Sequence, residues 1–432
     1  MTEPQRPFRA WAVPAGRRAR LAAAVLLAGL CVLALSSCAG VSYYWQSISG
    51  HLQMVNAARP VEDWLGDPET PAQLKSRLAL SREVRRFAVS ELQLPDNPSY
   101  HRYADLQRKA VVWNVVAAPA FSLTLENWCF PVAGCVGYRG YFDEADARAE
   151  AERLQKRGLE TTVFGVPAYS TLGWMNWAGG DPLLNTFINY PEGELARLVF
   201  HELAHQVLYV SGDTMFNESF ATTVERLGSA RWLAERSAAP AQQEYAAFDA
   251  RRQQFRALAL ETRRELEAIY DNDAKQRKAN GDAVDPAVRA ALKAAAMQRF
   301  RGRYAELKQS WGGFAGYDNY VAGANNASFG AQAAYDELVP GFEALFEREG
   351  RDWARFYAAA KNLAALSKGK RRDELEALAA QAAPPVAAAT STATTVSTTT
   401  TTSIMSTAPP ATPTPVPPGR GPGAASLSPA RP

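Results

Sequence analysis

The chain has 432 residues and carries 47 Lys and Arg against 44 Asp and Glu, a formal net charge of +3 at neutral pH. No basic stripe follows the first 20 residues, so the composition excludes a nucleic-acid-binding protein. With 47% hydrophobic residues, the chain is long enough for one large domain or two lobes around a cleft.

Residues 1–37 have the pattern of a lipoprotein signal peptide. Five arginines lie ahead of the apolar run 21–35, and two serines stand directly before Cys38. A transmembrane anchor is the competing interpretation, but the run is shorter than the roughly twenty residues that span a bilayer. Small residues before a cysteine favour cleavage there, and we expect Cys38 to carry lipid.

The leader also predicts where the mature protein works. Its removal takes away five arginines and Glu3, which leaves 42 Lys and Arg against 43 Asp and Glu, a net charge of −1. Ala39 follows the cysteine in place of the aspartate that would disfavour outer-membrane sorting in a Gram-negative host. We therefore expect a protein anchored to a bacterial membrane through Cys38 and facing the periplasm, with the outer membrane favoured.

The first elements of the mature chain are predicted to be helical. Residues 43–118 alternate amphipathic stretches with breaks at Pro60, Pro71 and 96–98. This pattern is typical of a helical subdomain.

Two cysteines, Cys129 and Cys135, remain once Cys31 leaves with the leader and Cys38 is lipidated. They lie six residues apart around a proline and a glycine, so they can close a small loop in an oxidising periplasm. A second zinc site is the alternative, but no histidine lies nearby to complete one. A disulfide is therefore expected.

Short strands are expected over residues 136–142 and 161–166, where β-branched and aromatic residues are frequent. Both precede the most specific motif of the chain. An edge strand in this order can lie along a cleft and pair with an extended peptide.

That motif is His201-Glu202-Leu203-Ala204-His205-Gln206, inside a helical pattern that begins at Pro191 with acidic residues. Residues four apart share one face of a helix, so both imidazoles can hold the same ion, and Glu202 can reach the water that the ion binds. Purely structural histidines are the alternative. However, only four histidines occur in the chain and two of them fall in this motif, which predicts a zinc peptidase site.

The third zinc ligand is predicted to be Glu218. Turn residues 211–213 let a second helical pattern, which closes at Gly228, fold back beside the first and present this carboxylate. We expect Asn217 and Glu225 to act from outside the ligand set, Glu225 by orienting a ligating histidine. Other candidates for the third ligand are Asp213 in the turn, Glu225 itself, and the distant His51 and His101.

The motif 201–206 and the run 217–221, Asn-Glu-Ser-Phe-Ala, resemble the gluzincin clan, including the aminopeptidase N type. Residues 213–222 look more closely like the bacterial putative aminopeptidase family of predicted zinc-dependent lipoproteins. The resemblance extends from Cys38 to about residue 370, with further shared segments at 43–46, 129–135 and 325–327. It implies that zinc is held by His201, His205 and Glu218, with Glu202 as the catalytic carboxylate.

One segment departs from the aminopeptidase N type, which reads a free amino terminus partly through Gly-x-Met-Glu-Asn. The nearest match is 173–177, Gly-Trp-Met-Asn-Trp, which lacks the acid. Peptide hydrolysis is thus better supported than amino-terminal specificity. An oxyanion donor is also required, and Tyr320 and Tyr335 are candidates, although tyrosines more often serve packing.

The rest of the chain predicts a long antiparallel helical hairpin, over 242–270 and 286–311, with a solvated charged surface or, alternatively, a partner-docking arm. From about Pro384 the chain is Ala, Thr, Ser and Pro, a composition typical of disorder. The predicted boundaries are 1–37 for the leader, 38–380 for a metallopeptidase domain and 381–432 for the tail.

The predicted fold class is mainly α (α+β): a zincin-like core with a small sheet beside the zinc helix, a helical N-terminal subdomain and the helical hairpin. The predicted function is zinc-dependent hydrolysis of a peptide substrate at the periplasmic membrane face, as an aminopeptidase. A cell-wall peptide hydrolase and a non-catalytic lipoprotein scaffold are the alternatives. The retained Glu202 argues against the scaffold, because a site that has lost catalysis does not need to keep the catalytic base.

Overall fold

The computed structural model describes residues 43, 45–130, 134–168, 170–173, 176–280, 285–332 and 337–382. The leader with Cys38, the tail and Tyr335 lie outside these residues, so the predictions that concern them are not addressed by the fold. The chain divides into two compact units, Met1–Asn56 and Ala57–Pro432. Residues 45–56 of the first unit are helical. Among the described helices, none combines the length and hydrophobicity that crossing a bilayer requires.

The predicted helices at the start of the second unit are present. Helices α2 (Val61–Gly66) and α3 (Ala72–Ser90) each follow a proline, Pro60 or Pro71, that occupies the N-cap position. Proline has no amide hydrogen to lose there, because the first amides of a helix lack partners in any case. The expected breaks are therefore helix starts.

The last part of the predicted helical region is instead the central strand of a sheet. Strand β3 (Val112–Pro119) lies between β6 (Arg139–Tyr141) and β7 (Leu159–Val166), and it pairs antiparallel with both. Every residue of β3 except Pro119 is buried. A strand covered on both faces is a continuous apolar run without alternation, and periodicity alone cannot distinguish such a run from a buried helix.

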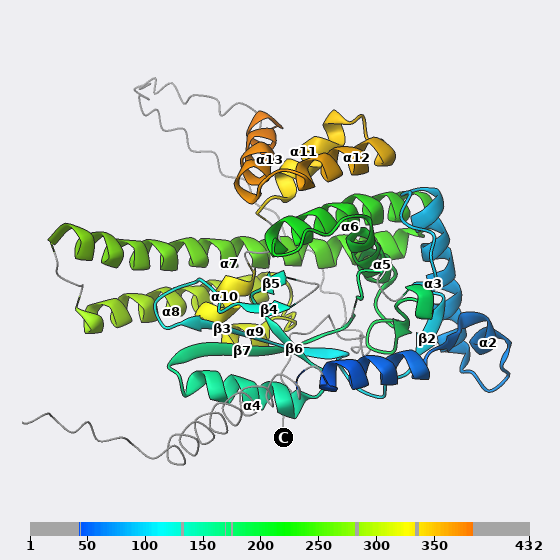
Figure 1. Cartoon of the computed structure of the whole chain (residues 1–432), viewed down its shortest axis with the longest axis horizontal. Coiled ribbons are helices and arrows are strands. Elements are labelled where there is room, and N and C mark those ends of the chain that lie inside the picture. The colour runs from blue at the N-terminus through cyan, green and yellow to red at the C-terminus, as the bar shows by residue number, and fades with distance from the viewer. Residues whose placement is uncertain are drawn as a thin grey trace, which may run out of the picture. The chain divides into compact units, whose positions relative to one another are not determined.

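Helices cover the sheet β6-β3-β7 on both faces and leave β7 at its edge (Figure 1). Helix α4 (Glu144–Gln155) follows β6, and α10 (Asn326–Gln332) packs Ala327 against Val116 and Ala118 of β3. Asn325 donates from Nδ2 to Thr161 O of β7, at 2.9 Å. The segment 325–327 thus fastens α10 to the sheet.

Two smaller sheets complete the strand structure. One has the order β1-β2-β8, with bounds Arg59–Pro60, Arg102–Ala104 and Leu183–Leu184. The other is the hairpin of β4 (Trp128–Phe130) and β5 (Gly134–Val136). The strand expected over 136–142 is therefore divided between β5 and β6, whereas the one expected over 161–166 is confirmed as β7.

Helices α5 (Glu192–Val207) and α6 (Thr214–Arg236) form a tightly packed pair. Helix α6 does not close at Gly228, as predicted, but runs on for two further turns. A Cβ at Gly228 would lie 2.7 Å from Leu92 Cδ1 and 3.0 Å from Phe200 Cδ2. The glycine permits close packing in the middle of a helix, and its position in the sequence alone resembles a C-terminal stop signal.

The predicted helical hairpin is confirmed and is longer than expected. Helix α7 (Ala239–Asn280) and helix α8 (Pro286–Ser310) lie side by side (Figure 1). Their shared core includes Phe255, Leu266 and Phe300. The short helix α9 (Asp318–Gly323) follows, and the η1 turn (Asn176–Ala178) lies upstream.

Three helices close the described chain, α11 (Val339–Arg348), α12 (Trp353–Ala364) and α13 (Lys368–Ala382). Phe342 of α11 contacts Phe216 and Phe220 of α6, with ring centroids 5.2 and 5.7 Å apart. This packing supports α6 from the side remote from β3.

Candidate metal centre

Helices α5 and α6 bring three donor side chains together. His201 Nε2 lies 3.4 Å from Glu218 Oε2, His205 Nε2 lies 3.8 Å from Glu218 Oε1, and the two Nε2 atoms are 3.2 Å apart. These ligand atoms all lie within 4.8 Å of one another. Two imidazoles and one carboxylate with an open fourth position are the donor set of a catalytic zinc site, so the residues present fit this metal.

The short connection between α5 and α6 places Glu218 beside the histidines. Gly212 has a φ of +77°, which glycine adopts without strain. Asp213 caps α6 by accepting from the amide of Phe216. Asn217 accepts from the amide of Val210 and donates to its carbonyl, both at 2.8 Å. Asn217 therefore fixes the connection, and it acts on the ligand set through the backbone.

The alternative third ligands lie elsewhere. Asp213 faces Arg371, with Nη1 3.6 Å from Oδ2, and its carboxylate is committed to the helix cap. His101 is exposed immediately before β2, and His51 belongs to the other unit. Among the described residues, the group of metal-ligating side chains is His201, His205 and Glu218.

Glu225 contacts the ligand His201 from behind. Glu225 Oε2 lies 2.8 Å from His201 Nδ1, so the ring's Nε2 is left to face the cluster. Glu225 Oε1 accepts from Arg197 Nη1 at 2.6 Å. Arg197 Nε donates to Glu194 at 3.2 Å, and Glu194 in turn accepts from Arg252 of α7. This chain of buried charges extends from the metal centre to the helical hairpin.

Sequence reasoning identified Glu225 and missed Glu194, Arg197 and Arg252. A signal was available for two of them, since Arg197 lies four residues before His201 and three after Glu194, on one face of α5. No comparable signal pointed to Arg252, which reaches the network from a separate helix.

Buried charges set the electrostatics of the cluster. Burial alone would raise the pKa of the Glu225 carboxyl, but Arg197, His201 and Arg256 together hold it well below its usual range. Burial alone would likewise lower the pKa of the His201 ring, but Glu218 and Glu225 raise it to about 10. Burial lowers the pKa of His205 to about 4, since that ring lacks an equally close carboxylate.

Glu202, between the two histidines, has a different environment. Burial raises the pKa of its carboxyl to about 7, the charge of His201 opposes that rise, and Glu218 adds to it. A carboxyl that titrates near neutrality can both accept and return a proton under physiological conditions. Glu202 thus has the proton affinity that a general base needs.

A polar network holds the end of α5 next to Glu202. Gln206 Oε1 accepts from Asn97 Nδ2 at 2.7 Å, and its Nε2 donates to Ser99 Oγ at 3.2 Å and Asp181 Oδ2 at 3.4 Å. Ser99 Oγ also donates to Asn176 Oδ1, at 3.2 Å. The segment 173–177 is therefore joined to α5 through this network, although residues 174 and 175 lie outside the described part.

Of the two tyrosines proposed as oxyanion donors, only Tyr320 lies within the described residues. Tyr320 donates to Gln332 Oε1 at 3.0 Å in a cavity beside β7, and Tyr335 lies outside the described residues. Tyr209, four residues after His205, has its ring centroid 6.3 Å from that of His205. Burial, with a further contribution from Glu218, raises the pKa of Tyr209. Tyr209 is thus an oxyanion-donor candidate that sequence reasoning missed.

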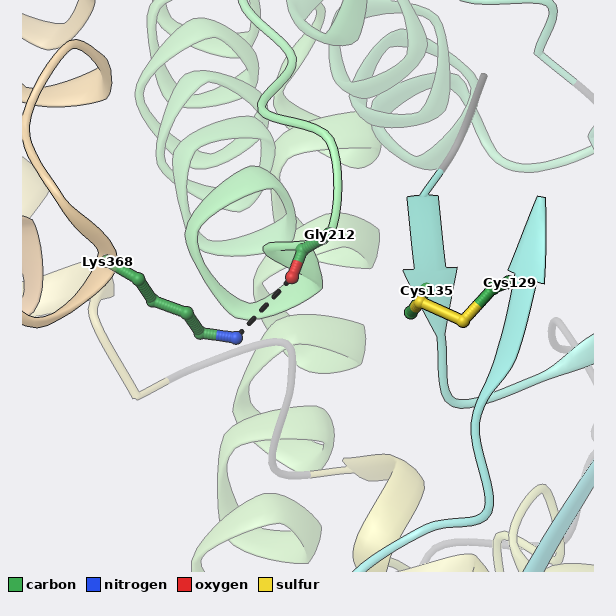
Figure 2. The surroundings of a disulfide bond; sticks show 4 residues. All are labelled: Cys129, Cys135, Gly212 and Lys368. Atoms are coloured by element: carbon green, nitrogen blue, oxygen red, sulfur yellow. Dashed lines mark hydrogen bonds between the residues drawn. A yellow bond between two sulfur atoms is a disulfide. The ribbon is translucent and has the colours of Figure 1, made fainter. Parts of the chain in front are cut away.

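The disulfide predicted between Cys129 and Cys135 is present (Figure 2). Its hairpin β4-β5 lies against the connection between α5 and α6, since a Cβ at Gly134 would lie 2.5 Å from Ser211 Oγ and 2.6 Å from Gly212 N. In Figure 2 the side chain of Lys368 points to the same turn, and its Nζ donates to Gly212 O at 3.4 Å. The turn that presents Glu218 is therefore held by the disulfide hairpin and by α13.

Comparison with known proteins agrees with the arrangement. The chain matches the model of the putative aminopeptidase family over residues 42–375. No curated protein and no solved structure gave a match. Because the family match includes helices α5 and α6 and most of the chain, this protein belongs to the putative aminopeptidase family.

Proposed function

We propose that the chain is a zinc-dependent peptidase that works at the periplasmic face of a bacterial membrane. His201, His205 and Glu218 hold the metal, and Glu202 is the general base. The observation that carries this proposal is the convergence of the three donor side chains within 4.8 Å, next to a carboxyl whose pKa is raised to about 7. The membership of the family supports a peptide substrate cut from its amino terminus.

A zinc ion at this site would lower the pKa of a coordinated water and polarise the scissile carbonyl. Glu202 takes the proton of the attacking water and passes it to the departing amine. Glu225 keeps Nδ1 of His201 protonated and its Nε2 free for the metal, because the carboxylate lies 2.8 Å from Nδ1. Tyr209, whose ring centroid lies 6.3 Å from that of His205, is our candidate donor to the developing oxyanion.

The first prediction tests the base. Glu202→Gln should keep zinc, since Glu202 is not a ligand, and should lower kcat by about 100- to 10,000-fold. The matched control is Glu235→Gln, an exposed position on α6 that should retain wild-type kcat. Metal content measured by elemental analysis and hydrolysis of a peptide library measured by mass spectrometry are the two readouts. Equal turnover by Glu202→Gln and wild type would rule out this mechanism.

The same library decides the specificity. Each peptide is offered with a free and with an acetylated amino terminus. An aminopeptidase cleaves the free form and leaves the blocked form intact, whereas an endopeptidase cleaves both. Hydrolysis of both forms at comparable rates would contradict the proposed cleavage from the amino terminus.

A further inference from the structure

The helix 45–57, shortly after the predicted lipid site, has an exposed apolar face. Trp45, Ile48 and Leu52 are 71%, 56% and 49% exposed. Their spacing of three and four residues places them in one stripe along the helix. Six large hydrophobic side chains are exposed in the part of the chain that the structure describes, and three of them form this stripe. A surface helix of a globular protein normally turns polar residues outward, so the stripe requires an explanation.

The opposite side of the same helix is buried. Met54 has no exposed surface, and Gly50, four residues before it, is buried as well. Residues four apart share a face, so these two form a second stripe, on the other side of the helix from Trp45. The helix is therefore apolar on two sides, and only one of them is covered by protein.

The helix carries no charge at neutral pH. None of residues 39–58 is Asp, Glu, Lys or Arg. The ring of His51 is neutral too, because burial lowers its pKa. An uncharged surface enters an apolar medium without the cost of removing ions from water. The stripe therefore suits an apolar partner, and attraction between opposite charges contributes nothing to its binding.

The predicted lipid site determines which apolar partner is near. Trp45 follows Cys38 by seven residues, and a chain of that length spans about 25 Å at most when fully extended. A lipid chain on Cys38 inserts into the bilayer, so it would keep Trp45 within that distance of the membrane surface. Tryptophan is also enriched at the boundary between headgroups and acyl chains. The bilayer is therefore always close to the stripe, whereas another protein has to diffuse to it.

The length of the stripe fits a helix that lies flat on the membrane. Trp45 and Leu52 are about 10 Å apart along the helix axis. The whole helix is about 20 Å long, shorter than the roughly 30 Å of a bilayer core. A short helix with a single exposed apolar face is stable in the plane of the interface, where that face contacts the acyl chains.

We propose that the helix 45–57 lies on the surface of the membrane that holds the lipid anchor, with Trp45, Ile48 and Leu52 inserted between the headgroups. The partner is a phospholipid bilayer, with no requirement for a particular headgroup charge. This inference rests on the membrane location in the proposed function and is independent of the metal centre. The helix gives the protein a second contact with the membrane in addition to the lipid.

The test uses the mature chain with Cys38→Ser, produced without its leader, so that no lipid is attached. Binding through the helix alone is weak and reversible, and it is measured by sedimentation with an excess of phosphatidylcholine vesicles. Added phosphatidylglycerol or high salt should change the partition coefficient by less than about twofold, because the helix is uncharged. Trp45→Ser/Leu52→Ser in the same protein should lower the partition coefficient about 10- to 100-fold, since two large apolar side chains leave the membrane.

The matched control is Val288→Ser/Leu292→Ser on α8, whose side chains are 50% and 47% exposed. This pair removes a similar amount of exposed apolar surface and should bind vesicles as the Cys38→Ser protein does. Because the four replaced side chains are exposed, both double variants should keep the urea midpoint of that protein. Zinc content and peptide hydrolysis should also stay unchanged, so the membrane contact and the peptidase proposal are tested separately.

Three results would overturn the inference. The Cys38→Ser protein could remain in solution at every vesicle concentration, or Trp45→Ser/Leu52→Ser could bind as strongly as that protein. An equal loss in Val288→Ser/Leu292→Ser would show adsorption through any exposed apolar side chain. A dimer that forms without vesicles and that Trp45→Ser/Leu52→Ser abolishes would assign the stripe to a second copy of the chain.

Discussion

At the scale of single residues, the candidate metal centre depends on side chains outside the predicted ligand set. Glu225 bonds to His201 on one side and to Arg197 on the other, at 2.8 and 2.6 Å. Both the carboxylate and the guanidinium are buried, so each stabilises the other where water cannot. Removing one member leaves a buried charge without compensation and frees the His201 ring to rotate.

We expect Glu225→Gln to weaken zinc binding about 10- to 100-fold, the usual effect of losing the group behind a ligating histidine. The amide can still accept from Nδ1, but it lacks the charge that raises the basicity of the ring and balances Arg197. Competition with a chromophoric chelator measures the affinity, and Glu235→Gln on the same helix is the control. Unchanged zinc affinity would show that Glu225 contributes packing and does not support His201 as a ligand.

Metal binding should release at least one proton at pH 7, from His201. In the metal-free protein, burial opposes protonation of His201, but Glu218 and Glu225 raise its pKa to about 10, whereas burial lowers the pKa of His205 to about 4. The metal must therefore displace a proton from His201 and none from His205. Zinc affinity should rise at least about tenfold per pH unit between pH 6 and 8, the sign expected when metal and proton compete.

Calorimetry in two buffers of different ionisation enthalpy counts the released protons. Release of no proton at pH 7 would contradict the assignment of a charged His201 in the metal-free protein. A zinc affinity that does not change between pH 6 and 8 would also contradict this assignment.

At the scale of elements, the turn between α5 and α6 sets the position of Glu218. Three separate contacts hold it, the Asn217 clamp on Val210, the β4-β5 hairpin at Gly134, and Arg371 of α13 on Asp213. None of these partners binds the metal, and each comes from a different part of the chain. The geometry of the ligand set is therefore supported by the surrounding packing.

The disulfide supports this turn, and removing it should be measurable. The variant Cys129→Ser/Cys135→Ser should unfold at lower urea concentration, with a loss of about 2 kcal/mol expected from closing so short a loop. It should also bind zinc less tightly, because the hairpin supports the turn before Glu218. Reductant should lower the urea midpoint of wild type and leave that of the double variant unchanged. Equal urea midpoints for wild type and the double variant would show that the disulfide does not stabilise this turn.

At the scale of the whole molecule, the proposed peptidase site and the proposed membrane anchor lie in different units of the chain. Ala57–Pro432 forms one unit with its own core, whereas the proposed lipid site at Cys38 belongs to the other unit. Folding of the catalytic unit therefore needs no lipid. We therefore propose that lipidation at Cys38 determines where the protein works and leaves its chemistry unchanged.

We expect Cys38→Ser to lose both metabolic labelling with palmitate and partition into detergent, because a lipid chain needs the thiol. Cys129→Ser/Cys135→Ser should keep the label. Peptide hydrolysis by a soluble form that begins at Ala39 should match that of the lipidated protein in detergent. If Cys38→Ser still carries the palmitate label, the lipid is attached at another residue and the assignment of Cys38 is wrong.

Part of the site could be predicted because it depends on interactions between residues that are close in the sequence. His201 and His205 share a helix face through the α-helical period alone, and Cys129 and Cys135 meet because six residues separate them. The turn at Gly212 is also local, since glycine accepts a positive φ. From these, the sequence predicted that Glu218 would return to the histidines.

Other features depend on contacts between distant segments, which only the tertiary structure decides. The run 112–118 is a strand because β6 and β7 pair with it, and Gly228 continues a helix because Leu92 and Phe200 pack over it. Arg252 reaches Glu194 across 58 residues of sequence. Propensity and periodicity act over a few residues, whereas burial and charge pairing depend on which surfaces meet. The sequence by itself therefore predicted the candidate metal ligands, and the tertiary structure decided the charge network behind them.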